Sequence, residues 1–188
     1  MSAYSIVLFL HIVGALGLFV AIGIELLTVS RLRSAGTAEQ AREWLSVLGS
    51  VRLIGPLALV TILVPGLYMA ATSTGWQGWN VAALVAMVVI AALGAASNAG
   101  RMPGIGRAIG PLRGALLSDA RTRLRDPFVW SSIQIRAGIA LGIVLNMTVK
   151  PDTFAAVLVL AAFALVGWAA ALVTGRAAQP VATEGSAS

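Results

Sequence analysis

Residues 4–28 read YSIVLFLHIVGALGLFVAIGIELLT, and this stretch decides the class of fold that the chain can adopt. It contains one carboxylate, Glu25, and one histidine, His11, and most of its other residues are apolar or small. About 20 apolar residues are needed for a helix to cross the hydrocarbon core of a bilayer. The stretch is therefore long enough to span a membrane as one helix, and it is too long for the core of a cleaved signal peptide.

Four further stretches of the chain have the same character, and more polar segments separate them. The five expected spans are Tyr4–Thr28, Leu53–Thr72, Val81–Asn98, Ser131–Val149 and Thr153–Thr174. Hydrophobic residues make up 59% of the 188 residues and charged residues 11%, whereas a soluble domain carries about 25% charged residues. We therefore predict an all-α fold, a polytopic transmembrane helical bundle of five spans, in which residues 1–176 form a single membrane domain and residues 177–188 a disordered tail.

Arginine is distributed unevenly among the segments that join these spans. The residues concerned are Arg31, Arg33, Arg42 and Arg52 after the first span, and Arg101, Arg107, Arg113, Arg121, Arg123 and Arg125 after the third. In contrast, residues 73–80 carry no charge, the turn after the fourth span has only Lys150 and Asp152, and the tail has Arg176. Because positively charged loops stay in the cytoplasm, this pattern predicts an outside N-terminus and a cytoplasmic C-terminus.

The composition excludes several kinds of site. The chain has no cysteine, which excludes disulfides, iron–sulfur clusters and zinc thiolates, and its single histidine excludes a metal site built on several histidines of one chain. The net charge of +6 is explained by membrane topology and by anionic lipid headgroups at the inner face, so no nucleic-acid partner is expected. No nucleophile–base pair or carboxylate pair can be placed in reach, and we expect a protein that is not an enzyme.

His11 is the first candidate for function, because polar side chains inside a bilayer are costly. It lies in the outer part of the first span, beside the small residues Gly14 and Ala15. One interpretation is a packing role, in which the ring is hydrogen-bonded to a neighbouring helix. The other is a ligand to haem or to a soft metal, because Met69 and Met147 are expected at a similar depth. A thioether–imidazole set suits Cu(I) and a His/Met pair suits haem, whereas ordinary packing is the alternative for both methionines.

Glu25 lies on the same face of the first span as His11, but nearer the cytoplasm. The two residues are about 21 Å apart along the helix axis, which is too far for an acid–base pair. Glu25 is expected to pair with Arg136, which enters the fourth span from the same side, because a lone carboxylate there would be costly. The second to fifth spans contain no acidic residue, so a proton relay across the bundle is not expected.

The fourth span carries a stripe of residues at intervals of four, namely Gln134, Gly138, Gly142 and Asn146. Small residues at this spacing let two helices approach closely, and the flanking amides can hydrogen-bond across the interface. We expect the stripe to pack against another helix or against a second protomer. In the second span, Pro65–Gly66 is expected to bend the helix and to free backbone carbonyl groups.

Two cytoplasmic loops are expected to be partly ordered. Thr37 followed by Gln40 fits a capping box, and it begins a predicted amphipathic helix that lies on the membrane and leads into the second span. The apolar stripe of this helix consists of Ala41, Trp44, Leu45, Leu48 and Val51. The longer loop, Gly100–Trp130, begins with glycine and proline punctuation and continues into Leu112–Leu124, a basic and partly helical segment.

Several short motifs follow one another along the chain: Phe9-Leu10-His11-Ile12-Val13-Gly14-Ala15, Gly55-Pro56, Pro65-Gly66-Leu67-Tyr68-Met69, Gly75-Trp76 with Trp79, and Asn146-Met147-Thr148-Val149-Lys150-Pro151. In this order of motifs, about the first 151 residues resemble a bacterial family of predicted integral membrane proteins whose function is uncharacterised. The resemblance implies a four-helix bundle of the bacterial cytoplasmic membrane, to which the fifth span is added. A more distant resemblance is to the membrane part of copper-resistance D proteins, and it implies metal handling at His11. The chain lacks the further histidines that a copper pathway is expected to have.

Two functional hypotheses follow from the sequence. The first is a non-enzymatic membrane protein that binds a small ligand, haem or copper in the outer half of the bundle, around His11. The second is an accessory or assembly subunit of a larger membrane complex, or a homo-oligomer, suggested by the stripe in the fourth span and by the basic inner loops. A small transporter or channel comes third, because it would need sustained polar lining of several spans.

Overall fold

The structure is a computed structural model that describes residues 3–177, apart from the side chains of Val51, Arg176 and Ala177. The expected disordered tail, residues 177–188, lies outside the described residues except for the backbone of Ala177. The side chain of Arg176, which belongs to the expected topological pattern, lies outside them too.

The described residues form α-helices joined by short turns, as the sequence predicts. In chain order the helices are α1 Ala3–Arg33, α2 Ala38–Val51, α3 Ile54–Met69, α4 Gly78–Ala95, α5 Met102–Ile109, α6 Ser118–Leu124, α7 Pro127–Val149 and α8 Thr153–Ala177. Two π-helical turns, η1 Ala70–Thr74 and η2 Ala96–Arg101, extend α3 and α4.

Five helical segments are long and apolar enough to cross a membrane, which agrees with the number of spans expected from the sequence. They are Ala3–Arg33, Ala38–Thr74, Gly78–Ile109, Ser118–Val149 and Thr153–Gly175. Each of these segments contains one of the five expected spans. The prediction of five candidate spans in an all-α chain is therefore confirmed.

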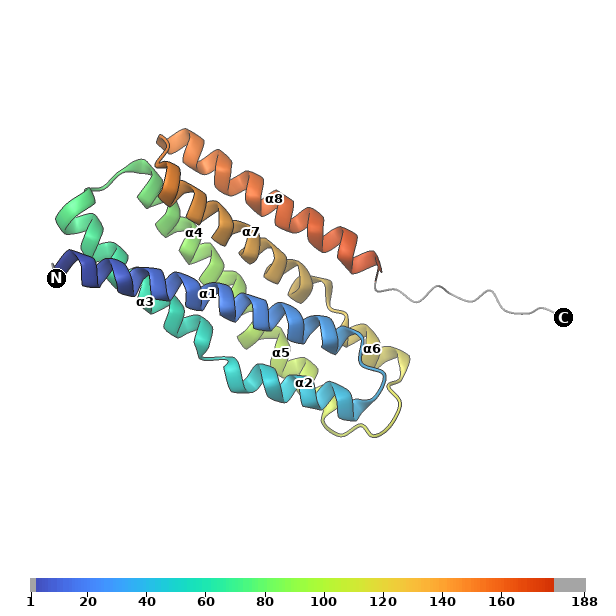
Figure 1. The fold of residues 1–188 in the computed structure, drawn as a ribbon. Coiled ribbons are helices and arrows are strands. Elements are labelled where there is room, and N and C mark those ends of the chain that lie inside the picture. The colour runs from blue at the N-terminus through green and yellow to red at the C-terminus, as the bar shows by residue number, and fades with distance from the viewer. Residues whose placement is uncertain (1–2, 178–188) are drawn as a thin grey trace.

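The long helices form two groups that meet along α1 and α7 (Figure 1). In the first group, α1 packs against α3; in the second, α7 packs against both α4 and α8. Helix α8 lies at the edge of the bundle, with α7 as its main neighbour and α4 as its second. The short helices α2, α5 and α6 gather at one end of the bundle (Figure 1).

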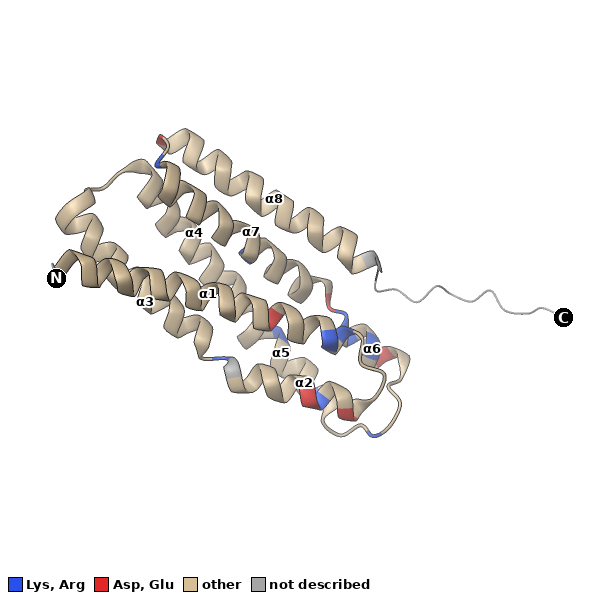
Figure 2. Ribbon diagram, viewed as in Figure 1, with Lys and Arg blue, Asp and Glu red and all other residues tan. Residues whose placement is uncertain are grey.

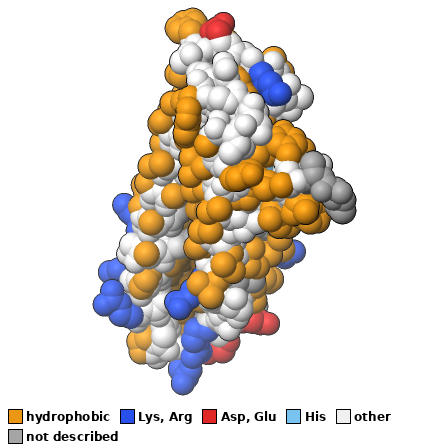
Figure 3. All heavy atoms as spheres, turned by 90° about the vertical axis from the view of Figure 1, so that its left-hand side faces the viewer, with side chains coloured by type: hydrophobic (Ala, Val, Ile, Leu, Met, Phe, Trp, Pro, Cys, Tyr) orange, Lys and Arg blue, Asp and Glu red, His pale blue; other side chains and the backbone are white. Residues whose placement is uncertain are grey.

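Charge is concentrated at the end that carries the short helices (Figure 2). We call this end the basic end, and the end that carries η1 and the turn between α7 and α8 the far end. Lys150 and Asp152 are the charged residues of that turn. The flanks between the two ends expose many large apolar side chains, and such side chains are spread over much of the face shown in Figure 3. This exposure is compatible with contact to lipid and would be unusual for a surface in water.

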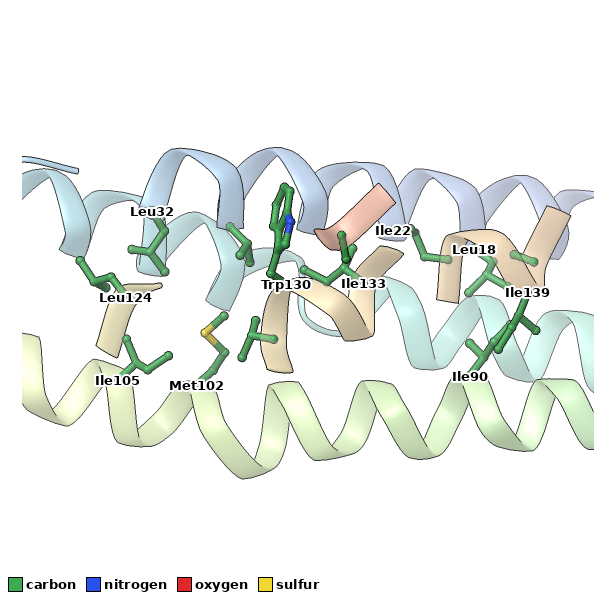
Figure 4. Packing of buried hydrophobic residues seen from close by; sticks show 14 of the residues in the cluster. Leu18, Ile22, Leu32, Ile90, Met102, Ile105, Leu124, Trp130, Ile133 and Ile139 are labelled. Carbon is green, nitrogen blue, oxygen red and sulfur yellow. The ribbon is translucent and has the colours of Figure 1, made fainter. Parts of the chain in front are cut away.

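The buried core follows the junction between the two groups and continues to the basic end (Figure 4). Its labelled members are Leu18, Ile22, Leu32, Ile90, Met102, Ile105, Leu124, Trp130, Ile133 and Ile139. On α1 the buried residues are Gly14 and, from Leu18 onward, a helical stripe that ends at Arg33. Helix α1 thus packs mainly against α3 and also contacts α2, α6 and α7.

Helix α2 begins as expected, but its apolar face has another partner. The hydroxyl of Thr37 accepts a hydrogen bond from the N–H of Gln40 (3.3 Å), and the Gln40 side chain accepts one from the N–H of Gly36 (3.0 Å). The sequence placed the apolar face of α2 against the membrane, whereas in the structure α2 packs against α1 and α5 and buries Ala41.

The apolar face of α2 finds a partner in α5. This helix lies in a segment that was expected to be a loop because of its glycine and proline residues. Pro103 stands in the first turn of α5, where a proline is tolerated because its missing N–H would be unpaired anyway. Met102, Ile105 and Ile109 then follow at helical spacing and are all buried. This face gives α2 an apolar neighbour within the chain.

Candidate functional site

His11 lies in the contact between α1 and α3, where the two backbones approach each other closely. A Cβ atom added to Gly14 would lie 2.8 Å from the backbone nitrogen of Ile62, and one added to Gly17 would lie 3.4 Å from the Cβ of Ala58. Small residues on α1 therefore allow α3 to come within reach of the His11 side chain.

The imidazole of His11 is hydrogen-bonded to the backbone of α3. Its Nδ1 atom lies 2.9 Å from the carbonyl oxygen of Ile62. A carbonyl oxygen only accepts, so Nδ1 carries the proton, and the tautomer of imidazole that has its proton on Nδ1 holds a lone pair on Nε2. The described residues give Nε2 no hydrogen-bond partner, and His11 is only partly buried. The ring also lies against Gly66, where an added Cβ would be 3.2 Å from Cε1.

The hydrogen bond from His11 reaches α3 close to Pro65, which lies inside this helix. Pro65 has no N–H and cannot donate to the carbonyl of Thr61, one turn earlier. The side-chain hydroxyl of the same residue, Thr61, donates to the carbonyl of Leu57 (2.8 Å). The carbonyl of Ile62 lies three residues before Pro65 on α3, and the imidazole of His11 lies against Gly66, so the histidine and the Pro65–Gly66 pair lie together.

The two methionines of the expected site belong to different parts of the bundle. Met69 is buried on α3, one turn beyond Gly66, and so shares the helix pair of His11. Met147 is partly buried on α7, which packs against α8, α4 and α1. Within the described residues, no hydrogen bond joins His11 to either sulfur atom, and no three His, Cys, Asp or Glu side chains lie close enough to hold a metal ion.

Glu25 and Arg136 form the ion pair that their positions suggested. Nη2 of Arg136 lies 2.8 Å from Oε2 of Glu25, and the side chains are 7% and 8% exposed. The contact is close but lacks the alignment of a hydrogen bond, and Oε1 of Glu25 has no hydrogen-bond partner among the described residues. The Nε atom of Arg136 donates to the carbonyl of Ser132 (3.3 Å). The pair thus fixes α1 to α7 at a buried level.

A second buried polar contact, which was not predicted from the sequence, lies beside this pair. The hydroxyls of Ser97 and Ser132 are 3.1 Å apart, and both approach the carbonyl of Leu93, at 2.7 and 3.1 Å respectively. Ser97 belongs to the π-helical turn η2 and Ser132 to α7. Serine is common at helix contacts in membranes, but this one lies in a π-helical turn that no pattern in the sequence predicts.

The stripe on α7 is used within the chain. Added Cβ atoms on Gly138 and Gly142 would meet Phe163 of α8, in the first case its carbonyl oxygen. The amide of Asn146 donates to the carbonyl of Ala156 (3.0 Å), and an added Cβ on Gly167 would meet the carbonyl oxygen of Gln134. Of the two expected partners, a helix of the same chain is therefore the one that occupies this face.

Another site lies at the basic end, among arginines that the sequence analysis treated only as topological markers. The guanidinium carbon of Arg33 lies 4.9 Å from the centre of the Trp130 ring, and Arg125 lines two cavities together with both residues. The signal in the sequence is modest: two arginines at helix ends and a tryptophan one turn into the next helix. The sequence does not show where α8 lies, and α8 forms one wall of this site.

The chain gives no match when it is compared with protein-family models, with curated proteins or with solved structures.

Proposed function

We propose that this protein is a non-enzymatic integral membrane protein that binds a small ligand through His11, either haem or a copper ion. In this proposal the chain lies in a bacterial cytoplasmic membrane with its N-terminus outside and the basic end in the cytoplasm. The concentration of arginine at one end supports this orientation, because positively charged loops are retained in the cytoplasm. His11 then lies in the outer half of the bundle.

The observation that carries the proposal is the hydrogen bond from Nδ1 of His11 to the carbonyl of Ile62. Histidines that bind metals usually donate their other ring N–H to a carbonyl or carboxylate, which fixes the tautomer and the ring orientation. His11 has this arrangement on Nδ1 and keeps Nε2 for a ligand. For Cu(I), the nearest soft donor along the helix pair is Met69, whereas the coordination of a haem iron by imidazole requires no thioether.

The alternative function is that of an accessory or assembly subunit. Two observations suggested it, the stripe on α7 and the basic loops, and the first no longer supports it. The stripe from Gln134 to Asn146 was to be the docking face, but α8 of the same chain covers it. The basic loops stay as its other support.

The test is an absorption spectrum together with elemental analysis of the purified protein, run beside two variants of His11. The wild type is expected to show a Soret band or bound copper, and His11→Ala is expected to lose it. In His11→Asn, the amide nitrogen can occupy the place of Nδ1 and donate to Ile62, but nothing replaces Nε2. This variant should keep the stability of the wild type and still lose the ligand.

The same experiment separates binding from packing. If His11 has only a packing role, the wild type is colourless and free of metal, and His11→Ala changes only stability, by about 1 kcal/mol for the lost hydrogen bond. That result would refute the proposal. Met69→Leu and Met147→Leu show which thioether takes part: weakened copper binding in Met69→Leu alone is the expected result for a copper site.

A further inference from the structure

Two neighbouring cavities open at the basic end, where α1 and α8 end and α7 begins. Their volumes are about 530 Å³ and about 420 Å³, and Arg33, Arg125 and Trp130 line both of them. Because the two cavities share these side chains, we treat them as two arms of one candidate site, which we call the arginine pocket. It lies at the opposite end of α1 from His11 and does not depend on a ligand there.

Arg33 is buried in the arginine pocket, with 8% of its surface exposed. It lies over the ring of Trp130, and it donates hydrogen bonds to the backbone carbonyls of Arg125 (3.3 Å) and Gly175 (3.5 Å). The indole N–H of Trp130 in turn donates to the hydroxyl of Thr174 (3.1 Å). The Trp130 ring of α7 and the backbone carbonyls of Arg125 and Gly175 therefore hold the Arg33 guanidinium in place.

Arg125 completes a pair of like charges. Its Nε atom donates to the carbonyl of Arg33 (3.4 Å), so each arginine contacts the backbone of the other. No carboxylate among the described residues forms an ion pair with either of them. The nearby carboxylate of Asp126 is engaged elsewhere, because it pairs with Arg101 (2.8 Å) and caps α7 through the N–H of Phe128 (2.8 Å).

Two neighbouring guanidinium groups, near Asp126 but in no direct ion pair with it, attract a further anion, and guanidinium donors match the geometry of phosphate oxygens. Apolar side chains that line the pocket favour an anion that also has an apolar part. Trp168 and Leu172 of α8 line one arm and are 48% and 41% exposed, and Leu27 of α1 lines the other and is 54% exposed. A ligand that fills the pocket thus presents an anionic group to the arginines and an apolar body to the helices.

We propose that the arginine pocket binds the phosphate headgroup of an anionic phospholipid, whose acyl chains lie along α1 and α8. The level of the pocket fits this ligand, because Arg33 is the last residue of α1 and Pro127 the first of α7, at the helix ends where headgroups lie. Basic pockets between membrane helices on the cytoplasmic side are typical sites for such headgroups. Ser30, Ser34 and Thr174 supply hydroxyl groups around the second arm.

The test is native mass spectrometry of the full chain in a neutral detergent, titrated with phosphatidylglycerol and with phosphatidylcholine of the same acyl chains. We expect tighter binding of phosphatidylglycerol. Arg125→Gln is expected to weaken it about fivefold, since one arginine near an anionic lipid contributes about that factor. Arg113→Gln is the matched control, because Arg113 is an exposed arginine of the same end that does not line the pocket, and it should change the affinity little.

Two further measurements distinguish loss of the lipid site from misfolding and from binding of a free anion. Arg33→Gln removes a buried group and can impair folding, so Arg33→Lys, which keeps the charge, is measured beside it and is expected to retain more affinity than Arg33→Gln. Inorganic phosphate is added as a competitor and is expected to leave phosphatidylglycerol bound. Equal affinity for the two lipids, or equal effects of Arg125→Gln and Arg113→Gln, would overturn the proposal. Displacement by millimolar phosphate would overturn the assignment to a lipid and indicate a site for free anions.

Discussion

Glu25 and His11 are two polar residues of α1, and they find different kinds of partner. Glu25 meets a charged side chain, Arg136 of α7, whereas His11 meets a backbone carbonyl, that of Ile62. The first pairing was predictable, because a carboxylate at that depth needs a cation and the fourth span offers one. The second was not, because any carbonyl of a neighbouring helix could accept from a histidine, and the sequence does not fix the register of α1 against α3.

The Glu25–Arg136 pair leads to a prediction about stability. Arg136→Gln leaves the carboxylate of Glu25 buried without its counter-charge, and this is expected to lower the free energy of unfolding by about 3–5 kcal/mol. The double variant Glu25→Gln/Arg136→Gln removes both charges and is expected to be more stable than Arg136→Gln alone. Unfolding of the detergent-solubilised protein measures both effects. The single variant Glu25→Gln completes the cycle, and a double variant that loses the sum of the losses of Glu25→Gln and Arg136→Gln would show that the two residues are energetically independent.

At the scale of elements, the close contact between α1 and α3 rests on glycine. A side chain at Gly14 would run into the backbone of Thr61 and Ile62, whereas an added Cβ on Gly23 of the same helix meets nothing within 4 Å. The register of this contact also decides whether His11 reaches the Ile62 carbonyl. The geometry of the candidate ligand site and the packing of the helix pair therefore depend on the same residue.

Gly14→Ala and Gly23→Ala form a matched pair of variants on one helix. Gly14→Ala is expected to lower the stability by about 1–3 kcal/mol, because the backbone of α3 has to move. Gly23→Ala is expected to be neutral or to stabilise by up to about 1 kcal/mol, since alanine favours helix more than glycine does. Thermal unfolding in detergent compares them. Equal melting temperatures for the two variants would contradict the contact between α1 and α3.

The helices were predictable to different degrees from the sequence. Long apolar segments gave the spans, because their length and composition leave few alternatives in a bilayer. Helix α5 was missed because glycine and proline usually mark turns, yet Pro103 lies where a helix tolerates it. The π-helical turns η1 and η2 were also missed, since they depend on how the ends of α3 and α4 fit their neighbours and not on a local pattern.

At the scale of the whole molecule, the two candidate sites lie at different levels of the bundle. His11 lies eight residues after the start of α1, and Arg33 is the last residue of the same helix, about 33 Å further along its axis. This distance is comparable to the thickness of the hydrocarbon core, about 30 Å. The two proposed ligands would therefore approach the protein from different sides of the membrane or at different depths within it.

The asymmetry of charge could be predicted from the sequence, because it follows from which loops carry arginine. The grouping of Arg33 and Arg125 into one pocket could not, because it requires the ends of α1, α7 and α8 to converge. The stripe on α7 shows the same limit: its residues predict a close helix contact, but they do not say whether the partner is α8 or another molecule.

The orientation of the bundle is the premise that both proposals share, and the chain is suited to a direct test because it contains no cysteine. Gln77→Cys places a thiol on the exposed far-end turn before α4, and Ser118→Cys places one on the exposed start of α6 at the basic end. Each single-cysteine protein is treated with a membrane-impermeant maleimide, first in intact cells and then after lysis. We predict that Gln77→Cys is labelled in intact cells and that Ser118→Cys is labelled only after lysis. Labelling of Ser118→Cys in intact cells, with Gln77→Cys protected, would contradict the orientation.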